Sequence, residues 1–281
     1  MNNLLESIKI IRLVNCLMAM MGVLIGAILT HASFVYYSAA ISSLAAFAVC
    51  AAGNILNDLL DIDSDRINRP HRVLVRGALS RRYALIMMFV LNFLGLALAM
   101  TVNAAVVTAV IIAIVLLAAY NRYLKRLPLL GNTVIAFLGG LTFVTGAVAA
   151  EESFLALPPG PLTAAGIAFF FHLAREVVKD MQDIAGDDFA GVLTLPQRIG
   201  PRKSAIVALG LFLCSGVIAM VPVVNGRFSG SYATIAIYLD IVPLLGLMIA
   251  FVARPTVSMS KIVSTALKAG MVLGIVALAM A

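Results

Sequence analysis

Nine long apolar runs constrain this chain more than any other feature of its sequence. They cover residues 13–30, 35–56, 83–101, 103–120, 129–150, 162–178, 205–224, 232–252 and 262–280. As helices, at about 1.5 Å per residue, these runs are long enough to cross a hydrocarbon core about 30 Å thick. Because backbone polar groups cannot stay unpaired in lipid, and the runs are continuous rather than alternating, we expect helices and not barrel strands. With 62% hydrophobic and only 12% charged residues, the composition argues against a soluble domain.

The basic residues give these runs an orientation. In a nine-helix layout, nineteen of the twenty lysines and arginines lie at or near one side, and only Arg227 falls on the other. The positive-inside rule therefore predicts a multi-pass cell-membrane protein with its N-terminus inside and its C-terminus outside. This topology explains most of the net charge of +7, so no nucleic-acid partner is needed to account for it.

A dense cluster of acids lies where the second apolar run ends. The sequence "NDLLDIDSDRINRP" holds four aspartates, which are Asp58, Asp61, Asp63 and Asp65. On a helix, at about 100° per residue, Asn57, Asp61 and Asp65 share one face. Asp58 lies close to that face, whereas Asp63 points away. Like charges one turn apart repel each other, so the row needs a hard divalent cation or basic side chains to compensate it. A solvated, salt-bridged loop is the alternative.

A second acidic motif follows 122 residues after the first. The "DIDSD" of the first motif returns as "DIAGD" at 183–187, where Asp180, Asp183 and Asp187 again cover a narrow helical arc. Four apolar runs separate the copies, an even number, so both motifs face the same side of the membrane. We therefore expect a single membrane domain in which a four-helix unit is repeated and one more helix follows. The domain is 1–281, its repeat units are about 1–128 and 129–252, and the last helix is 262–280.

Two acidic motifs at one membrane surface favour a shared site. Mg²⁺ is typically held by one or two carboxylates plus substrate phosphates, so the motifs point to diphosphate chemistry. Arginine offers a planar fork to phosphate oxygens, and lysine offers a compact charge. Among the basic residues near the motifs we favour Arg72 and Lys125 for this role, although the positive-inside bias alone also places basic residues here.

Both motifs resemble those of the UbiA superfamily of intramembrane prenyltransferases. "NDLLDIDSD" fits its NDxxDxxxD motif, and "DIAGD" followed by "GVLTLPQRIG" fits its second DxxxD motif. The resemblance covers nearly the whole chain. It implies an all-α integral membrane fold of nine transmembrane helices around a central cavity that opens laterally to lipid. It also implies a Mg²⁺-dependent enzyme that takes a polyprenyl diphosphate donor.

Roles follow for residues at the matching positions and for the charged residues beside them. The expected metal ligands are Asp61, Asp65, Asp183 and Asp187. The residues expected to bind substrate are Asn57, Arg72, Lys125, Lys179 and Asp180, together with Arg12 and Asn15 for the acidic group of an acceptor. The catalytic candidates are Asp58, Asp61 and Asp183. A base must deprotonate an acceptor hydroxyl, and the choice between Asp58 and Asp183 stays open.

The amino-acid sequence of three segments predicts the acceptor. "GNILNDLLDIDSDRINRPHRVLVRGALS", "LKRLPLLGN" and "REVVKDMQDIAGD" resemble the archaeal-type branch of the superfamily, although Val73 stands where relatives often have a second proline. This branch implies transfer of a geranylgeranyl group to the hydroxyl of geranylgeranylglyceryl phosphate, a lipid-like, phosphate-bearing acceptor, which gives digeranylgeranylglyceryl phosphate for ether-lipid synthesis. An aromatic quinone precursor of the hydroxybenzoate or dihydroxynaphthoate type is the alternative acceptor. A cation-coupled transporter is the alternative of another class, but the acids cluster at one face and not at the midplane.

Asp240 lies deep inside an apolar run, where an ionisable residue is a functional candidate by default. An ion pair with Lys268 of the last run is the alternative. We leave Asp240 outside the predicted site.

Overall fold

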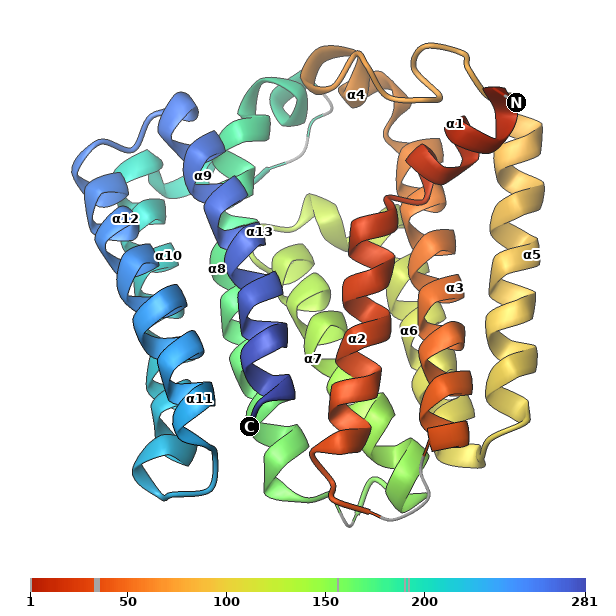
Figure 1. Ribbon diagram of the computed structural model, residues 1–281. Helices are drawn as coiled ribbons and strands as arrows, with labels where there is room; N and C mark the ends of the chain where they lie inside the picture. Colours follow the sequence, from red (N-terminus) through yellow and green to blue (C-terminus); the bar gives the residue numbers. More distant parts are fainter. Residues whose placement is uncertain (1, 33–35, 156, 190, 192) are drawn as a thin grey trace.

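The computed structural model describes residues 2–32, 36–155, 157–189, 191 and 193–281, with the backbone alone for 2, 3, 185–187 and 189. Within this part the chain is all helical and forms a bundle of roughly parallel helices (Figure 1). The helices are α1 (Asn2–Ile10), α2 (Leu13–Ile28), α3 (Tyr36–Leu60), α4 (Ile62–Asn68), α5 (Arg81–Met100), α6 (Ala104–Arg122), η1 (Leu124–Arg126), α7 (Leu130–Glu151), α8 (Pro159–Phe189), α9 (Leu195–Ile199), α10 (Pro201–Val224), α11 (Gly230–Ala233), η2 (Thr234–Ile241), α12 (Val242–Ala253) and α13 (Val257–Ala279).

The expected all-α membrane class is confirmed. In the described part, eight helices are long and apolar enough to cross a membrane, or nine if the bent pair α1–α2 forms one span. One of the eight combines α11, the π-helix η2 and α12. The chain is therefore a multi-pass membrane protein, whereas the number of nine spans stays a prediction.

The second acidic motif lies on a helix that extends past the sixth apolar run. α8 continues as far as Phe189, well beyond the apolar run that ended at 178. Contacts with neighbouring elements hold this polar extension in place. The Gln182 side chain donates to the Ser260 carbonyl of α13 at 3.0 Å, and Asp183 accepts a hydrogen bond from Arg69.

A sharp bend separates α1 from α2 and places Arg12. The two helices meet at 59°, and Arg12 at the junction has a left-handed backbone with φ 55° and ψ 61°. This conformation is uncommon for a residue other than glycine. The Asn54 side chain of α3 donates to the Ile11 carbonyl at 2.9 Å, which satisfies an acceptor at the break. The bend therefore aims Arg12 at the end of α3.

Glycines let α2 and α7 approach until their backbones touch. A Cβ atom added at Gly146 would lie 1.9 Å from the Val23 carbonyl oxygen, and one at Gly26 would lie 2.1 Å from that of Phe143. Small residues are the usual means by which membrane helices pack this closely. The α2–α7 pair is thus a tightly packed part of the bundle.

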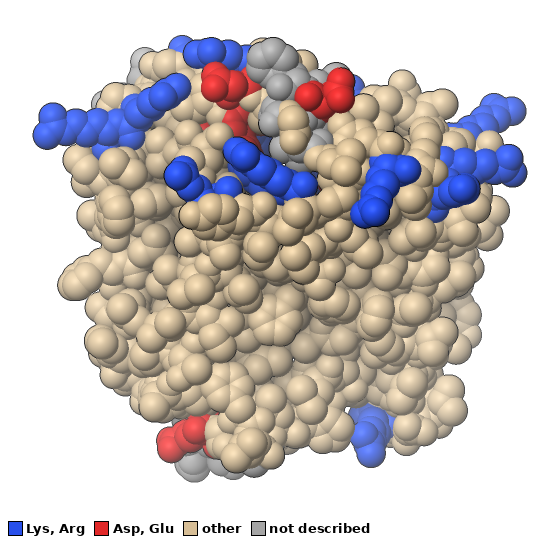
Figure 2. Space-filling view, turned by 180° about the vertical axis from the view of Figure 1, so that it is seen from behind, with Lys and Arg blue, Asp and Glu red and all other residues tan. Residues whose placement is uncertain are grey.

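Charged side chains concentrate at one end of the molecule. Figure 2 shows Lys and Arg gathered at the end that carries α1 and α4, above a broad uncharged band. Apolar side chains such as Phe93 and Val217 are exposed on the outside, as expected for contact with lipid. Lys268 departs from this pattern, because it is the twelfth of the 23 residues of α13 and not near the inner surface, where the charge count had placed it.

Candidate active site

A cavity of about 940 Å³ lies inside the bundle. Its lining residues come from α2, α3, α4, α6, α7, α8, η2 and α13, among others. Acids, arginines and amides line one end, near α4, while apolar side chains such as Phe143, Ile167 and Leu278 line other parts of the wall. The volume is near the upper end of ligand pockets, so the cavity can take an amphipathic molecule.

Three side chains of the first acidic motif form one row on the cavity wall. Asn57 is in the last turn of α3, and Asp61 and Asp65 follow at the start of α4 and within it. The Asp61 N–H donates to the Asn57 carbonyl at 2.9 Å, and the Asp65 N–H donates to the Asp61 carbonyl at 2.8 Å, so helical spacing persists across the α3–α4 junction. Lys125 contacts the Asp61 carboxylate. Asp63 also lines the cavity but lies outside this row, as expected, with 77% of its side chain exposed.

Two arginines hold the buried carboxylate of Asp58. Arg12 donates to Asp58 at 2.5 Å and to the Asn57 side chain at 2.7 Å. Arg72 also contacts Asp58 and bonds Asp65 at 2.9 Å. Asp58 is not among the described residues that line the cavity. Its position therefore suits a residue that orients the two arginines better than one that receives a proton from a substrate.

Arg69 joins the two acidic motifs across the cavity mouth. Its guanidinium donates to Asp183 of α8 at 2.5 Å and lies 3.7 Å from Asp65. The Asn68 side chain donates to the Asp183 backbone carbonyl at 3.1 Å. The motifs therefore lie side by side although 122 residues separate them in the sequence. Asp187 is on α8, but its side chain lies outside the described residues.

Burial and charge oppose each other at the mouth. Burial raises the pKa of Asp65, and the charges of Arg72 and Arg69 offset this rise only in part. Burial, together with the charge of Arg12, lowers the pKa of Arg72. Burial would also lower the pKa of Arg69, but the charges of Asp183 and Asp65 outweigh it and raise that pKa. Asp65 therefore depends on its arginine partners to stay ionised, whereas both arginines remain charged throughout.

Carboxylates from both motifs fit a hard cation that binds together with a substrate. No three His, Cys, Asp or Glu side chains in the described part come close enough to hold a metal ion by themselves. Mg²⁺ does not need such a cluster, because it retains waters and takes substrate phosphates as ligands. Asp61, Asp65 and Asp183 line the same mouth and would hold it there with a diphosphate.

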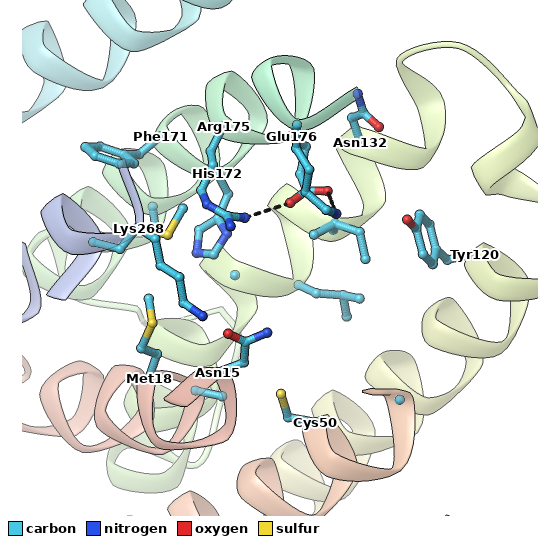
Figure 3. A pocket seen from close by; sticks show the side chains of 18 of the residues that line it. Asn15, Met18, Cys50, Tyr120, Asn132, Phe171, His172, Arg175, Glu176 and Lys268 are labelled. Atoms are coloured by element: carbon cyan, nitrogen blue, oxygen red, sulfur yellow. Dashed lines mark hydrogen bonds and ion pairs between the residues drawn. The ribbon is translucent and has the colours of Figure 1, made fainter. Parts of the chain in front are cut away.

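Polar residues of the cavity that were not singled out from the sequence include Arg69, Arg175, Glu176 and Asn132. The buried Glu176 accepts hydrogen bonds from Lys179 at 2.8 Å and from Arg175 at 3.1 Å (Figure 3). Glu176 lies within the apolar run 162–178, near its end. An ionisable residue in such a run is a functional candidate, but we applied this rule only to Asp240. Asn132 donates to Asp180 at 2.8 Å from α7, and no local pattern marks it.

Most of the predicted site residues do line this one cavity. They are Arg12, Asn15, Asn57, Asp61, Asp65, Arg72, Lys125, Lys179, Asp180 and Asp183. Asp240 lines it too, but forms no ion pair with Lys268. A membrane-spanning bundle with acids and bases gathered at the mouth of a cavity is typical of an enzyme that acts on an amphipathic, anionic substrate. The UbiA prenyltransferase family matches the chain over residues 19–261, and the protein belongs to this family.

Known proteins agree with this assignment. The chain is 40% identical over 192 residues to digeranylgeranylglyceryl phosphate synthase of Thermococcus gammatolerans, with 68% of each chain covered. A solved structure described as that of digeranylgeranylglyceryl phosphate synthase in membranes is similar at a TM-score of 0.75 and 28% identity, over 99% of this chain and 98% of that one. A UbiA homolog from Archaeoglobus fulgidus, bound to GPP and Mg²⁺, has the same fold at a TM-score of 0.61 and 18% identity, over 98% and 99%. The protein is a prenyltransferase, and the transporter alternative is set aside.

Proposed function

We propose that this enzyme transfers a geranylgeranyl group from its diphosphate to the hydroxyl of geranylgeranylglyceryl phosphate, which gives digeranylgeranylglyceryl phosphate for ether-lipid synthesis. The observation that carries the proposal is the meeting of two aspartate motifs at the mouth of one cavity with apolar walls. The acceptor in this proposal is inferred from the similarity of the chain to digeranylgeranylglyceryl phosphate synthase.

The donor diphosphate lies at the mouth in this proposal. Asp61, Asp65 and Asp183 would hold Mg²⁺ there, with Asp187 as a further ligand, and Lys125 would bind phosphate oxygens. When bound, the metal stabilises charge on the departing diphosphate. The apolar walls receive the prenyl chain and keep water away from the reacting carbon.

The acceptor hydroxyl attacks the first carbon of the donor chain. A carbon–oxygen bond forms there, the bond from that carbon to the diphosphate breaks, and the electron pair leaves with the diphosphate. The hydroxyl proton goes to a carboxylate. Asp183 is the better candidate for this base, because it lines the cavity and Arg69 bonds only its Oδ2 atom in the described part. Asp58 is instead paired with Arg12 and Arg72 behind the wall.

We also propose that the bundle has nine spans and lies in the cell membrane with the N-terminus and the site on the cytoplasmic side. The concentration of Lys and Arg at the end that holds α4 supports this orientation. We likewise propose that the chain is a single membrane domain with an internal repeat of a four-helix unit.

An assay of diphosphate release tests the function. Purified protein with Mg²⁺, geranylgeranyl diphosphate and geranylgeranylglyceryl phosphate should release diphosphate only when both substrates are present. Asp61→Ala and Asp183→Ala should each lower turnover by about 100-fold or more, since each removes a group that stabilises transition-state charge. Asp63→Ala, with an exposed side chain beside the same motif, is the matched control and should keep activity.

Two results would contradict the proposal. Turnover of a hydroxybenzoate or naphthoate with none of geranylgeranylglyceryl phosphate would overturn the acceptor. Full activity in both aspartate variants would overturn the two-motif site.

A further inference from the structure

Two cations lie in the cavity away from the aspartate motifs. Lys268 is halfway along α13, and Arg175 lies inside the candidate membrane span Pro159–Ile184 of α8. Both residues line the cavity. Charged side chains at this depth are costly, and they face a partner or a polar cavity when they occur. Each of the two cations is therefore a candidate for binding a ligand in the cavity.

The two cations approach the same part of the wall. The Arg175 Nε atom donates to the Ser264 carbonyl of α13 at 3.4 Å. Ser264 is four residues before Lys268, so both are on one face of α13. Figure 3 shows Arg175 and Lys268 at neighbouring positions, with the Lys268 side chain reaching into the open space towards Asn15 of α2.

Too little negative charge surrounds these cations. Arg175 and Lys179 share a single carboxylate, that of the buried Glu176. Lys268 forms no ion pair and no hydrogen bond with any described residue. Among the described residues, Arg175, Lys179 and Lys268 thus have one ion-paired carboxylate between them, and Lys268 has no share in it. Uncompensated charge is expensive to bury, so the surplus favours an anionic ligand.

Asp240 does not neutralise Lys268. A Cβ atom added at Gly270 of α13 would lie 2.5 Å from the Asp240 Oδ1 atom, so this carboxylate packs against the Gly270 face. Gly270 and Lys268 are two residues apart, about 200° around the helix. Asp240 Oδ1 has no hydrogen-bond partner among the described residues. The Asp240 carboxylate and the Lys268 side chain therefore lie on different sides of α13.

Arg12, the residue expected to bind the acceptor's acidic group, is engaged elsewhere. It holds Asp58 and Asn57 at the mouth. Arg175 lies eight residues before Asp183 on α8, about 12 Å deeper by helical rise. The cavity thus offers two separate places for anions, one at the aspartates and one deeper.

We propose that Arg175 and Lys268, with the Asn15 amide across the cavity, bind the phosphate of the acceptor. This inference rests on the proposed function, and it names the deeper site as a receptor for a phosphate monoester carried by a lipid. The acceptor hydroxyl then lies between this phosphate and the aspartates, where the donor carbon is attacked. A guanidinium and an ammonium suit such a phosphate because both donate charge-assisted hydrogen bonds.

The test compares two acceptors that differ only in the phosphate. Geranylgeranylglyceryl phosphate and geranylgeranylglycerol are each assayed with geranylgeranyl diphosphate and Mg²⁺. Lys268→Gln should raise the KM for the phosphate acceptor by about 10- to 100-fold, the usual range for losing a hydrogen bond to a charged group. The KM for the donor and the turnover of geranylgeranylglycerol should stay unchanged, and Lys268→Arg should restore most of the loss.

Lys261→Gln is the matched control, because Lys261 is an exposed residue seven positions earlier on α13. It should leave both acceptors unaffected. Asn15→Leu provides a second variant that alters no charge, and it should raise the KM of the phosphate acceptor alone. This variant decides the question if Lys268→Gln does not give a monodisperse protein.

Three results separate the possible failures. An equal loss with both acceptors, or a raised donor KM, would overturn the phosphate site. An unchanged KM in both Lys268→Gln and Asn15→Leu would do the same. If the unaltered enzyme does not use geranylgeranylglyceryl phosphate, the proposed function fails first.

Discussion

Replacing Arg72 with methionine tests how strongly the cavity mouth depends on its paired charges. Arg72 bonds Asp65 at 2.9 Å and contacts Asp58, and only 14% of its side chain and 5% of either carboxylate side chain is exposed. Methionine keeps much of the volume and removes the charge. Two neighbouring buried carboxylates then lose a shared partner.

The expected cost is about 3 kcal/mol. Removing one partner of a buried ion pair typically costs about 3–5 kcal/mol, and the lower end applies because Arg12 and Arg69 still compensate Asp58 and Asp65. At about 2–4 °C per kcal/mol for a chain of this size, the midpoint of thermal unfolding should fall by roughly 6–12 °C. Melting of the purified, metal-free protein followed by circular dichroism measures the shift.

Arg76→Met is the control, with the same substitution four residues later. Its guanidinium pairs with Glu6 at 2.8 Å, but 42% of the Arg76 side chain is exposed, so solvent screens the pair. This variant should melt within the scatter of the unaltered protein. Equal shifts for both variants, or none for Arg72→Met, would refute the reasoning that burial makes the Arg72 pairs important.

Two further predictions concern the metal and the packing of the bundle. EDTA should abolish prenyl transfer and Mg²⁺ should restore it, while the melting temperature changes little; activity in verified metal-free buffer would contradict the metal assignment. Gly146→Ala should destabilise the protein by about 1–3 kcal/mol, because the new methyl group meets the Val23 carbonyl. Gly246→Ala, where nothing lies within 4 Å, should be neutral or stabilising, and equal melting of the two variants would show that the close approach is not important.

The sequence predicted the membrane helices, which depend on the local apolar pattern, but not the features that depend on contacts between distant segments. Apolar runs gave the membrane helices because each run is read within one helix. The run at 162–178 did not reveal that α8 continues to Phe189, since contacts from other elements, such as that of Gln182 with the Ser260 carbonyl, hold the polar extension. The π-helical turn around Asp240 has no counterpart in the apolar pattern either.

Some features of the site were likewise predicted from local spacing, and others depend on tertiary contacts. Helical spacing alone was enough to place Asn57, Asp61 and Asp65 on one face. The same spacing put Asp58 near that face, but its burial behind Arg12 and Arg72 depends on tertiary contacts. The link from Arg69 to Asp183 spans 114 residues, and no local pattern encodes such a pair.

The pairing of the mouth acids with basic residues of the same chain has a consequence for biogenesis. Asp61 contacts Lys125 and Asp183 bonds Arg69, so the acids carry their own counter-charges. A newly inserted chain can therefore complete its bundle without a metal supply, unlike a zinc finger, whose folding energy is metal-binding energy. With Mg²⁺ bound at these acids as proposed, the magnesium supply would govern how fast the enzyme works and not how long it survives in the bilayer.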